Sequence, residues 1–450
     1  MQELIKKNEI YRVKCESINP YGKGVSRIDN LVVFITDLYP EEEADIKITK
    51  VEKNYLMGEV VKYIKKVDKR LLGIIPTSAY PFKNIDFSYE CELKGELVKN
   101  NISYRCKKEL DKIEVLYALP IKAYRNKVTA FFTKDYDYGS FMEGTHNIII
   151  KEDEDEIDLN IKDVIESLLR SLKYNNISIY DYKTNNGSIK GVSIRRSSLN
   201  NKISVMILSK KDEPLLFKVA ESLSKNTLIT GISVSIDNSN KTNVYTGEEK
   251  VLYGIPYITE KILDIEFKIS NQTFLQVNTN GASLLYKEAI KMADLKENDT
   301  ALDLYSGAGG ISLNLAKYVK KVIGIEIVGD AVKNAEENAK LNGINNVSFY
   351  CSDSSHFKDI LGPNKPSVLF VDPPRAGLSS GVISDIISYK FNKIIYVSCD
   401  PYTLSRDLSL FTMSGYEIKE VKCVNMFPRT RHVESVCLLS YNTVTWEIKK

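Results

Sequence analysis

A cysteine at the end of a predicted strand is the first residue that could do chemistry. Cys399 follows the apolar residues 394–398 and precedes an Asp-Pro pair and a predicted helix. A thiol that lies where a strand opens into a loop before a helix can have a lowered pKa and act as a nucleophile. Most free cysteines are instead small buried hydrophobes, so position alone leaves Cys399 open as nucleophile or core filler. Three others lie in apolar strand contexts and are predicted to be fillers: Cys351, Cys423 and Cys437.

A carboxylate near the end of the chain is the second candidate. The segment from Asn425 to Glu434 joins the last two predicted strands and carries His432 as well as Glu434. Glu434 stands at a strand start beside the apolar Val433 and Val436. A carboxylate in such surroundings is a candidate general base. A surface glutamate is the alternative.

A glycine-rich turn predicts a cofactor site. The predicted strand 299–305 leads into Ser306-Gly-Ala-Gly-Gly310 and then into a helix. Gly307 and Gly309 allow the backbone to turn tightly and to approach a ligand. Glu326 ends the next strand, where a carboxylate can accept hydrogen bonds from ribose hydroxyls. A turn that serves packing alone is the alternative.

Two cofactors fit this turn, a dinucleotide and S-adenosylmethionine. A dinucleotide site usually has the pattern G-x-G-x-x-G, and here position 312 is Ser. The fourth strand ends in Val371-Asp-Pro-Pro-Arg375, and ligands of open α/β sheets lie outside the carboxyl ends of the strands, so Asp372 is predicted at the site. Asp353, after the third strand, is placed either to meet an adenine amino group or to cap a helix.

Strands and helices that alternate from about residue 270 must position these groups. This alternation predicts an α/β domain over residues 269–450 with a doubly wound, mostly parallel sheet. Its expected helices include 311–318 and 330–342. Its expected strands are 299–305, 322–327, 347–351, 368–371, 394–398, 416–424 and 434–440.

The first half of the chain predicts two further domains. Five short strands with turn signals over residues 1–66 suggest a small β-barrel of the oligonucleotide-binding type. Residues 67–268 form a mixed α+β central domain, of which the part near 88–118 could pack on the catalytic domain. Residues 65–70 are expected to form an exposed connector. Other elements expected here are helices at 89–99 and 161–172 and strands at 188–195 and 203–208.

Composition narrows the class of protein. The 450 residues carry a net charge of +3. Residues 61–130 hold 15 Lys and Arg against 8 Asp and Glu, a net of +7, which is either a face for phosphates or an ordinary solvated surface. The acidic run 152–156 is expected to be a solvated loop. No apolar run of 18 residues occurs, so no membrane-spanning helix is expected. The first residues contain no apolar stretch, so no secretory signal is expected, and seven scattered cysteines favour a reducing cytoplasm.

Taken together, these segments resemble the family of RNA uracil-C5 methyltransferases. Residues 22–29 resemble the TRAM domain of its bacterial ribosomal RNA members, and Tyr124-Arg-Asn-Lys127 and Gly144-Thr-His146 resemble signatures of the middle domain. The other shared motifs are Phe274-Leu-Gln-Val-Asn278, Leu302-Asp-Leu-Tyr-Ser-Gly-Ala-Gly309, Asp372-Pro-Pro-Arg-Ala-Gly377, Ser398-Cys-Asp-Pro401 and Met426-Phe-Pro-Arg-Thr-Arg-His-Val-Glu434. The resemblance implies a Rossmann-like methyltransferase domain that acts, most simply, as a monomer without a membrane or an obligate protein partner.

The resemblance also implies a mechanism. The Cys399 thiolate would add to C6 of uracil, C5 would then attack the methyl group of S-adenosylmethionine, and Glu434 would remove the C5 proton before the thiolate leaves. The base must leave its stack to react, and the barrel and the basic middle region would hold the RNA. The resemblance implies cofactor contacts for Gln276, Tyr305, Glu326 and Asp372. Two further contacts are predicted from the sequence pattern, Gly307 in the glycine-rich turn and Asp353 after the third strand. Phe274 would pack on base or cofactor.

Two positions depart from the family pattern. Many ribosomal members hold an iron–sulfur cluster with four cysteines, three of them in a loop after the TRAM domain, but here residues 76–85 contain no cysteine. Four thiolates are needed, so no cluster is predicted. The second departure is Asp400, where the family often has Asn. A carboxylate beside the nucleophile should disfavour the thiolate.

Three functions remain open. The first is formation of 5-methyluridine in 23S ribosomal RNA, with transfer RNA as the alternative substrate. The TRAM-like barrel favours ribosomal RNA, because the bacterial transfer-RNA enzymes of the family usually lack it. The second is methylation of an amino group of adenine or cytosine, which needs no cysteine. The third is a non-catalytic RNA-binding factor in ribosome assembly.

Overall fold

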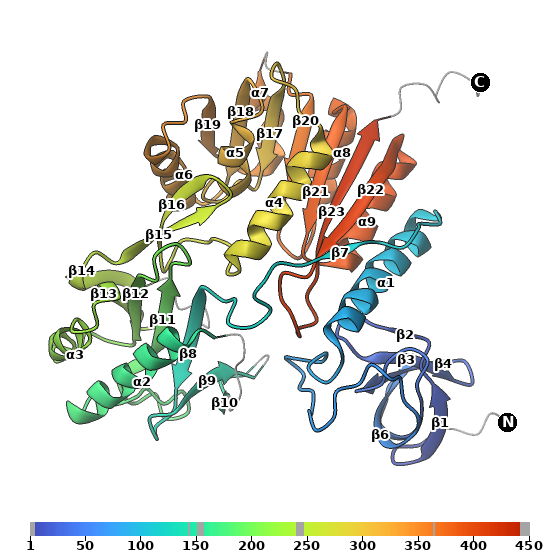
Figure 1. Ribbon diagram of the computed structural model, residues 1–450, viewed down its shortest axis with the longest axis horizontal. Helices are drawn as coiled ribbons and strands as arrows, with labels where there is room; N and C mark the ends of the chain where they lie inside the picture. The colour runs from blue at the N-terminus through green and yellow to red at the C-terminus, as the bar shows by residue number, and fades with distance from the viewer. Residues whose placement is uncertain (1–4, 143–144, 151–156, 240–246, 363–364, 442–450) are drawn as a thin grey trace. The chain divides into compact units, whose positions relative to one another are not determined.

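The computed structural model describes residues 5–142, 145–150, 157–239, 247–362 and 365–441 (Figure 1). The acidic run 152–156 lies outside these residues. The chain forms two compact units, the first made of residues 1–118, 287–295 and 361–450 and the second of residues 119–286 and 296–360. Two helices contain residues of both units, α4 (Thr279–Ala293) and α7 (Phe357–Leu361).

The first unit begins with a strand-rich, barrel-like sheet. Its strand order is β1-β5-β6-β4-β3-β2, and all neighbours are antiparallel except β4 and β6. Alternate residues in the first part of β5 are buried, namely Ala44, Ile46 and Ile48, which is the pattern of a strand with one face on a core. The six strands, one more than predicted, are β1 (Ile10–Lys14), β2 (Ser17–Ile18), β3 (Gly24–Ile28), β4 (Leu31–Thr36), β5 (Glu43–Val51) and β6 (Tyr55–Lys65).

Residues 65–70, the connector after this sheet, were predicted to be exposed, but the side chain of one of them is buried. The side chain of Arg70 is only 8% exposed and lies 2.6 Å from a carboxylate oxygen of Glu42 and 2.8 Å from one of Asp37. A buried cation needs such partners to offset the loss of water. The prediction was wrong for Arg70 because its two partners, Asp37 and Glu42, are 33 and 28 positions away in the sequence, and a local pattern does not show such contacts.

Helix α1 (Phe87–Cys106) follows this connector. It begins at the cap Asp86, whose carboxylate accepts the backbone N–H of Ser88, and it ends at Lys107 in the left-handed conformation. Within the first unit, α1 packs along α9 (Pro401–Met413), and β7 (Val115–Leu116) pairs in parallel with β22 (Tyr416–Val424).

The rest of the first unit is an α/β sheet with the order β20-β21-β23-β22-β7. Strands β20 (Val368–Val371) and β21 (Lys393–Ser398) are parallel, whereas β23 (Glu434–Tyr441) is antiparallel to β21 and β22. All of β20 and all but one residue of β21 are buried, as expected of strands with both faces covered. Helix α8 (Ser380–Tyr389) packs against α9.

The second unit contains a seven-stranded sheet with the order β10-β9-β8-β11-β12-β13-β14. Helices α2 (Leu159–Tyr174) and α3 (Leu216–Leu223) cover one of its faces and share an apolar core with it (Figure 1). The strands are β8 (Lys127–Phe132), β9 (Tyr138–Phe141), β10 (Ile148–Ile150), β11 (Ile189–Arg196), β12 (Ile203–Ser209), β13 (Ile229–Ile236) and β14 (Glu248–Gly254). The hairpin β15 (Tyr257–Ile262) and β16 (Ile265–Ser270) follows.

The second unit also holds three parallel strands in the order β19-β18-β17. These are β17 (Thr300–Leu304), β18 (Lys321–Glu326) and β19 (Val347–Cys351), and between them lie α5 (Gly310–Leu315) and α6 (Gly329–Leu341). A short 3-10 helix, η1 (Ser354–His356), follows β19. In the described part of the chain, every helix is too short or too polar to cross a membrane.

Candidate functional site

Two carboxyl groups and a thiol lie at one sheet edge of the first unit. Asp372 comes directly after β20 and Cys399 directly after β21, and these strands run in parallel. Strand β23 runs the other way and begins with Glu434, and its Ser435 is the partner of Ser398 in β21. The register therefore places Glu434 beside Cys399, at the edge where parallel strands end and ligands bind.

The pKa values of Asp372, Cys399 and Glu434 also indicate that these groups lie close together. Burial raises the pKa of Glu434 to about 8, and the negative charge of Asp372 adds to the effect. Burial likewise raises the pKa of Asp372 to about 6 and that of the Cys399 thiol to about 11, with Glu434 as the next cause for the thiol. A buried carboxyl with a pKa near 8 can exchange a proton near neutral pH.

Arg375 is a cation of this group and was not predicted as a site residue. Its positive charge lowers the pKa of both Glu434 and Cys399, against the effect of burial. Its backbone carbonyl accepts the hydroxyl of Thr403, and its guanidinium lies 3.4 Å from a ring nitrogen of His432. The signal was present in the sequence, because Arg375 completes the motif that begins with Asp372.

Asp400 has a structural role beside Cys399. It is the N-cap of α9, and its Oδ1 accepts the backbone N–H groups of Tyr402 and Thr403 at 2.9 Å. An asparagine offers the same oxygen at this position. Asp400 raises the pKa of Cys399, but burial, Glu434 and Asp372 come before it among the causes.

We expect Asp400→Asn to increase the reactivity of the Cys399 thiol. The cap is kept while a negative charge is removed, so the pKa of Cys399 should fall and its alkylation by iodoacetamide at pH 8 should rise by about threefold. Peptide mass spectrometry after timed alkylation measures this rate for Cys399 alone. An unchanged rate in a variant with the wild-type melting temperature would show that Asp400 does not affect the thiol.

The glycine turn of the second unit has the geometry of a ligand loop. Gly307 has a φ of 54° and Gly309 a φ of 86°, the left-handed region that glycine adopts without strain. A Cβ on Gly307 would meet open space, whereas one on Gly310 would lie 2.8 Å from the hydroxyl of Tyr286. Glu326 fixes the turn, because its Oε2 accepts the N–H of Gly307 at 3.0 Å and its Oε1 that of Val328 at 2.8 Å.

Tyr305 and Asp353 lie beside this turn in the second unit. Tyr305 has a φ of 66°, which is uncommon for a residue with a side chain and tends to occur at functional sites. Its phenol oxygen accepts the hydroxyl of Ser354 at 2.8 Å. Asp353 caps η1, with its Oδ1 accepting both N–H and O–H of Ser355. The helix-cap alternative for Asp353 is thus observed, and a contact with adenine remains a prediction.

Gln276 belongs to a segment that is held by three side chains in or next to the central sheet, of which Asn126 and Arg195 are buried and Lys127 is partly buried. The side-chain amide of Asn126 donates to the carbonyl of Gln276 at 3.2 Å and to the hydroxyl of Thr279 at 2.9 Å. Lys127 donates to the carbonyl of Asn271, and Arg195 to that of Thr273. None of these three was predicted as a site residue, although Asn126 and Lys127 belong to the motif Tyr124-Arg-Asn-Lys127.

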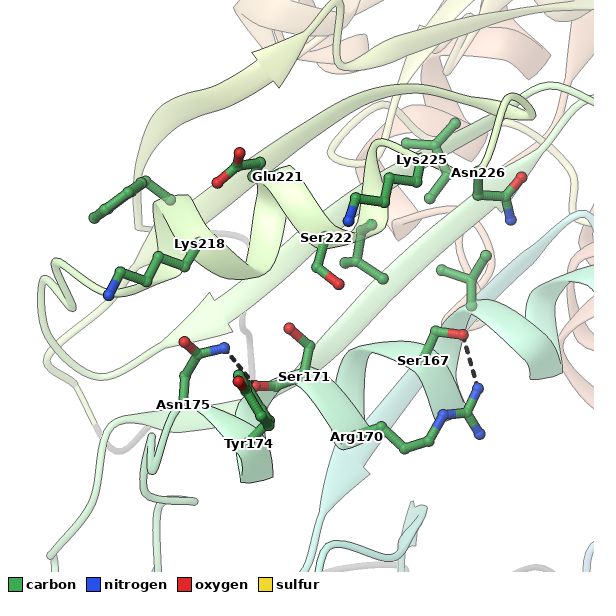
Figure 2. Close-up of a pocket in the computed structure, with 14 residues that line it drawn as sticks. Ser167, Arg170, Ser171, Tyr174, Asn175, Lys218, Glu221, Ser222, Lys225 and Asn226 are labelled. Atoms are coloured by element: carbon green, nitrogen blue, oxygen red, sulfur yellow. Dashed lines mark hydrogen bonds between the residues drawn. The ribbon is translucent and has the colours of Figure 1, made fainter.

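The cavity between α2 and α3 contains none of the candidate residues (Figure 2). It has a volume of about 750 Å³ and is lined by exposed polar side chains such as Arg170, Lys218 and Glu221, together with the exposed Phe217. The candidate residues lie instead at strand ends and turns of the α/β part. We therefore assign no chemistry to this cavity.

The cysteines are dispersed among the described residues. Cys423 and Cys437 are buried, as predicted for fillers, but Cys351 is exposed and the prediction was wrong there, because it is the last residue of β19. Cys91 and Cys106 lie in α1. In the ranges that the structure describes, no three side chains of His, Cys, Asp or Glu come together in a group that could hold a metal ion.

Comparison with known proteins identifies the family and the fold. A model of the family described as tRNA (Uracil-5-)-methyltransferase matches residues 108–442, and a TRAM domain model matches residues 6–61. An "Uncharacterized RNA methyltransferase" of Lactobacillus johnsonii is 33% identical over 449 residues, which cover 97% of this chain and 99% of that protein. A similarly named protein of Fusobacterium nucleatum is 33% identical over 463 residues and 97% of each chain.

Among solved structures, the Pyrococcus abyssi tRNA (uracil-54, C5)-methyltransferase in complex with S-adenosyl-L-homocysteine has a similar fold. The TM-score is 0.75 at 23% identity, over 95% of this chain and 100% of the other. The predicted fold class is confirmed, with an N-terminal TRAM domain and a Rossmann-like methyltransferase fold. The family match spans most of the chain and includes every candidate residue named above, and so the chain belongs to the tRNA (uracil-5-)-methyltransferase family of RNA methyltransferases.

Proposed function

We propose that this protein forms 5-methyluridine in 23S ribosomal RNA in the cytoplasm, with S-adenosylmethionine as methyl donor. Residues 1–66 would bind RNA, residues 67–268 form the central domain and residues 269–450 carry out the transfer. The observation that carries the proposal is the register of β21 and β23, which sets Cys399 beside Glu434 at the sheet edge. A thiol paired with a carboxyl base is what methylation at a carbon of uracil needs.

The glycine turn fits S-adenosylmethionine. Gly307 presents its backbone to open space, and Glu326 lies at the end of the adjacent strand β18, where its carboxylate can accept ribose hydroxyls. The residues that would hold the cofactor are Gln276, Tyr305, Gly307, Glu326, Asp353 and Asp372. When bound, S-adenosylmethionine supplies an electrophilic methyl group for the activated base.

Cys399 and Glu434 divide the chemistry between them. Uracil C5 is a weak nucleophile, and addition of the Cys399 thiolate to C6 converts the ring to an enolate that is nucleophilic at C5. After C5 carries the methyl group, the Glu434 carboxylate takes the C5 proton. The electrons of that C–H bond re-form the C5–C6 double bond, the C6–S bond breaks, and Cys399 leaves as thiolate.

RNA would reach this edge along the first unit. The target base has to leave its stack, and aromatic and basic side chains are suited to hold single-stranded neighbours. Arg431, in the loop before Glu434, lies over the exposed ring of Tyr21 in the turn between β2 and β3, 4.8 Å from its centroid. Arg105 lies 4.2 Å from the centroid of Tyr402 at the start of α9.

Transfer RNA is the second candidate substrate. It is favoured by the description of the matching family model and by the substrate named for the Pyrococcus abyssi protein. The TRAM domain over residues 6–61 is the observation that favours ribosomal RNA for this chain.

Mapping of 5-methyluridine in a deletion strain tests the proposal. We expect one or more positions in 23S ribosomal RNA to lose the modification and to regain it with the wild-type gene but not with Cys399→Ala. Loss of the modification only from transfer RNA would establish the second candidate. Unchanged 5-methyluridine in both RNAs would contradict both candidate substrates. Calorimetry with S-adenosylmethionine would then test whether the protein binds the cofactor or is an RNA-binding factor without it.

We expect kcat/KM to rise with pH. The pKa of Glu434 is raised to about 8 and that of Cys399 to about 11, so near neutral pH both groups hold protons that the reaction needs removed. Between pH 6 and pH 8 the rate should increase by at least about tenfold per unit. Methyl-transfer assays with limiting RNA over this range give the profile. A flat profile would contradict the assigned protonation states.

A further inference from the structure

Helix α1 places two opposite charges inside the first unit. Glu90 and Lys94 are both fully buried, one turn apart, and Lys94 Nζ lies 2.8 Å from Glu90 Oε1. Removing two charges from water is costly unless each group finds several good hydrogen bonds. The partners they find lie more than 330 positions further along the chain.

The three N–H donors of Lys94 are all used. One bonds Glu90, one bonds Oδ1 of Asn425 at 2.8 Å, and one bonds the carbonyl of Phe427 at 3.2 Å. The same carbonyl accepts the N–H and the hydroxyl of Thr430. Lys94 therefore holds both sides of the bend by which the chain leaves β22.

Glu90 closes the same loop from its other side. Its Oε1 accepts the side-chain amide of Asn425 at 2.8 Å and the backbone N–H of Arg429 at 2.9 Å. Arg429 has a φ of 69° and donates through its guanidinium to the carbonyls of Ile85 and Phe82. The turn is thus fixed at Asn425, Phe427 and Arg429, and we call residues 425–429 the base loop.

The base loop lies next to Glu434 through the pairing of β22 with β23, although residues 430–433 separate them along the chain. Val424, the last residue of β22, is the partner of Glu434 in the register of β22 and β23. Asn425 follows Val424, and its N–H bonds the carbonyl of Leu116 in β7. A shift of the base loop would therefore move the strand residue that faces Glu434.

We propose that Glu90 and Lys94 are positioning residues that hold the base loop so that Glu434 meets the proton on C5. The inference rests on the proposed role of Glu434 as base. The pair touches neither Cys399 nor the glycine turn in the described contacts, so its effect should fall on proton removal rather than on addition of the thiolate. A pair that only stabilises the fold would affect all steps alike.

The double variant Glu90→Gln/Lys94→Met tests this, because it removes both charges of the buried pair at once. Arg429, whose guanidinium lies 3.5 Å from Glu90 Oε2, keeps its hydrogen bonds to the carbonyls of Ile85 and Phe82. We expect turnover to fall by about 10- to 100-fold, as for a small displacement of a catalytic group. Trapping by RNA with 5-fluorouridine, which needs the thiolate but loses no proton, should stay within about threefold of wild type. With ordinary RNA, a methylated covalent complex should accumulate on denaturing gels.

The matched control is Glu96→Gln/Lys99→Met, a pair on the same helix with a distance of 3.8 Å, in which Glu96 is exposed and Lys99 is partly exposed. It should behave as wild type in all three measurements. If the double variant at Glu90 and Lys94 gives no covalent complex with ordinary RNA, or loses trapping and turnover together, the positioning role is wrong. If the wild type itself traps no 5-fluorouridine RNA, the proposed function fails instead.

If the double variant does not fold, the single variant Glu90→Gln tests the positioning role. It keeps the shape and the acceptor oxygen but loses the charge that balances Lys94. We expect the same accumulation of covalent complex, to a smaller extent. Normal turnover without accumulation in this folded variant would overturn the proposal.

Discussion

Replacement of Cys399 by alanine is expected to abolish methylation. Without the thiolate, C6 gains no substituent and C5 remains too weak a nucleophile to take a methyl group. We expect kcat/KM to fall on the order of 10⁴-fold or more, which corresponds to about 5.5 kcal/mol of lost transition-state stabilisation. Incorporation of labelled methyl groups into RNA measures the loss, and denaturing gels with 5-fluorouridine RNA should show no covalent complex.

The chain provides a matched control for this variant. Cys351 also ends a parallel strand of the α/β part and is more exposed than Cys399, so general loss of a reactive thiol is tested by Cys351→Ala. That variant should keep wild-type activity and trapping. Retained methylation in Cys399→Ala would contradict the covalent route and would favour transfer to an amino group of adenine or cytosine.

The strands of the α/β part could be predicted because each is an apolar run between turn signals. The predicted bounds 347–351 and 416–424 are those of β19 and β22. The same runs predicted the strand ends, and with them Cys399 and Asp372 at one edge. The pairing of β21 with β23 required the structure, because only the register shows that Glu434 starts beside Cys399.

The charge pattern was harder to interpret from the sequence. The net of +7 over residues 61–130 suggested a face for phosphates, but the cations differ in their surroundings. Arg70 is bound by Asp37 and Glu42, Lys94 is buried with Glu90, and Lys127 donates to a carbonyl inside the second unit. A cation that is used inside the fold looks the same in a sequence as one that meets RNA.

The supports of the site were missed for a related reason. Lys94 and Asn425 are separated by 331 positions, and Asn126 and Gln276 by 150. Polar contacts of such separation leave no periodic pattern, whereas the candidate catalytic residues stand at strand ends and in short motifs. Local rules therefore predicted candidate reactive groups and not the residues that hold them.

Replacement of Glu434 by glutamine is expected to stop the reaction after the methyl group has been transferred. Glutamine has nearly the same shape but cannot take the C5 proton, so turnover should fall by about 10²- to 10⁴-fold. The enzyme should accumulate as a methylated covalent complex with ordinary uridine RNA, detected by a shifted band that carries both protein and methyl label. Wild-type enzyme should show this band only with 5-fluorouridine RNA.

The pKa of Glu434 gives the variant two further signatures. Near pH 7 the carboxyl is mostly protonated, so trapping with 5-fluorouridine RNA should match wild type, whereas above pH 8 the wild-type carboxylate opposes ionisation of Cys399 and the glutamine variant should trap faster. A buried acid with a raised pKa destabilises the fold as pH rises toward that pKa, because the unfolded state releases the proton first. The variant should therefore melt no lower than wild type at pH 8. Slow trapping at every pH would instead assign Glu434 to the addition step and not to removal of the C5 proton.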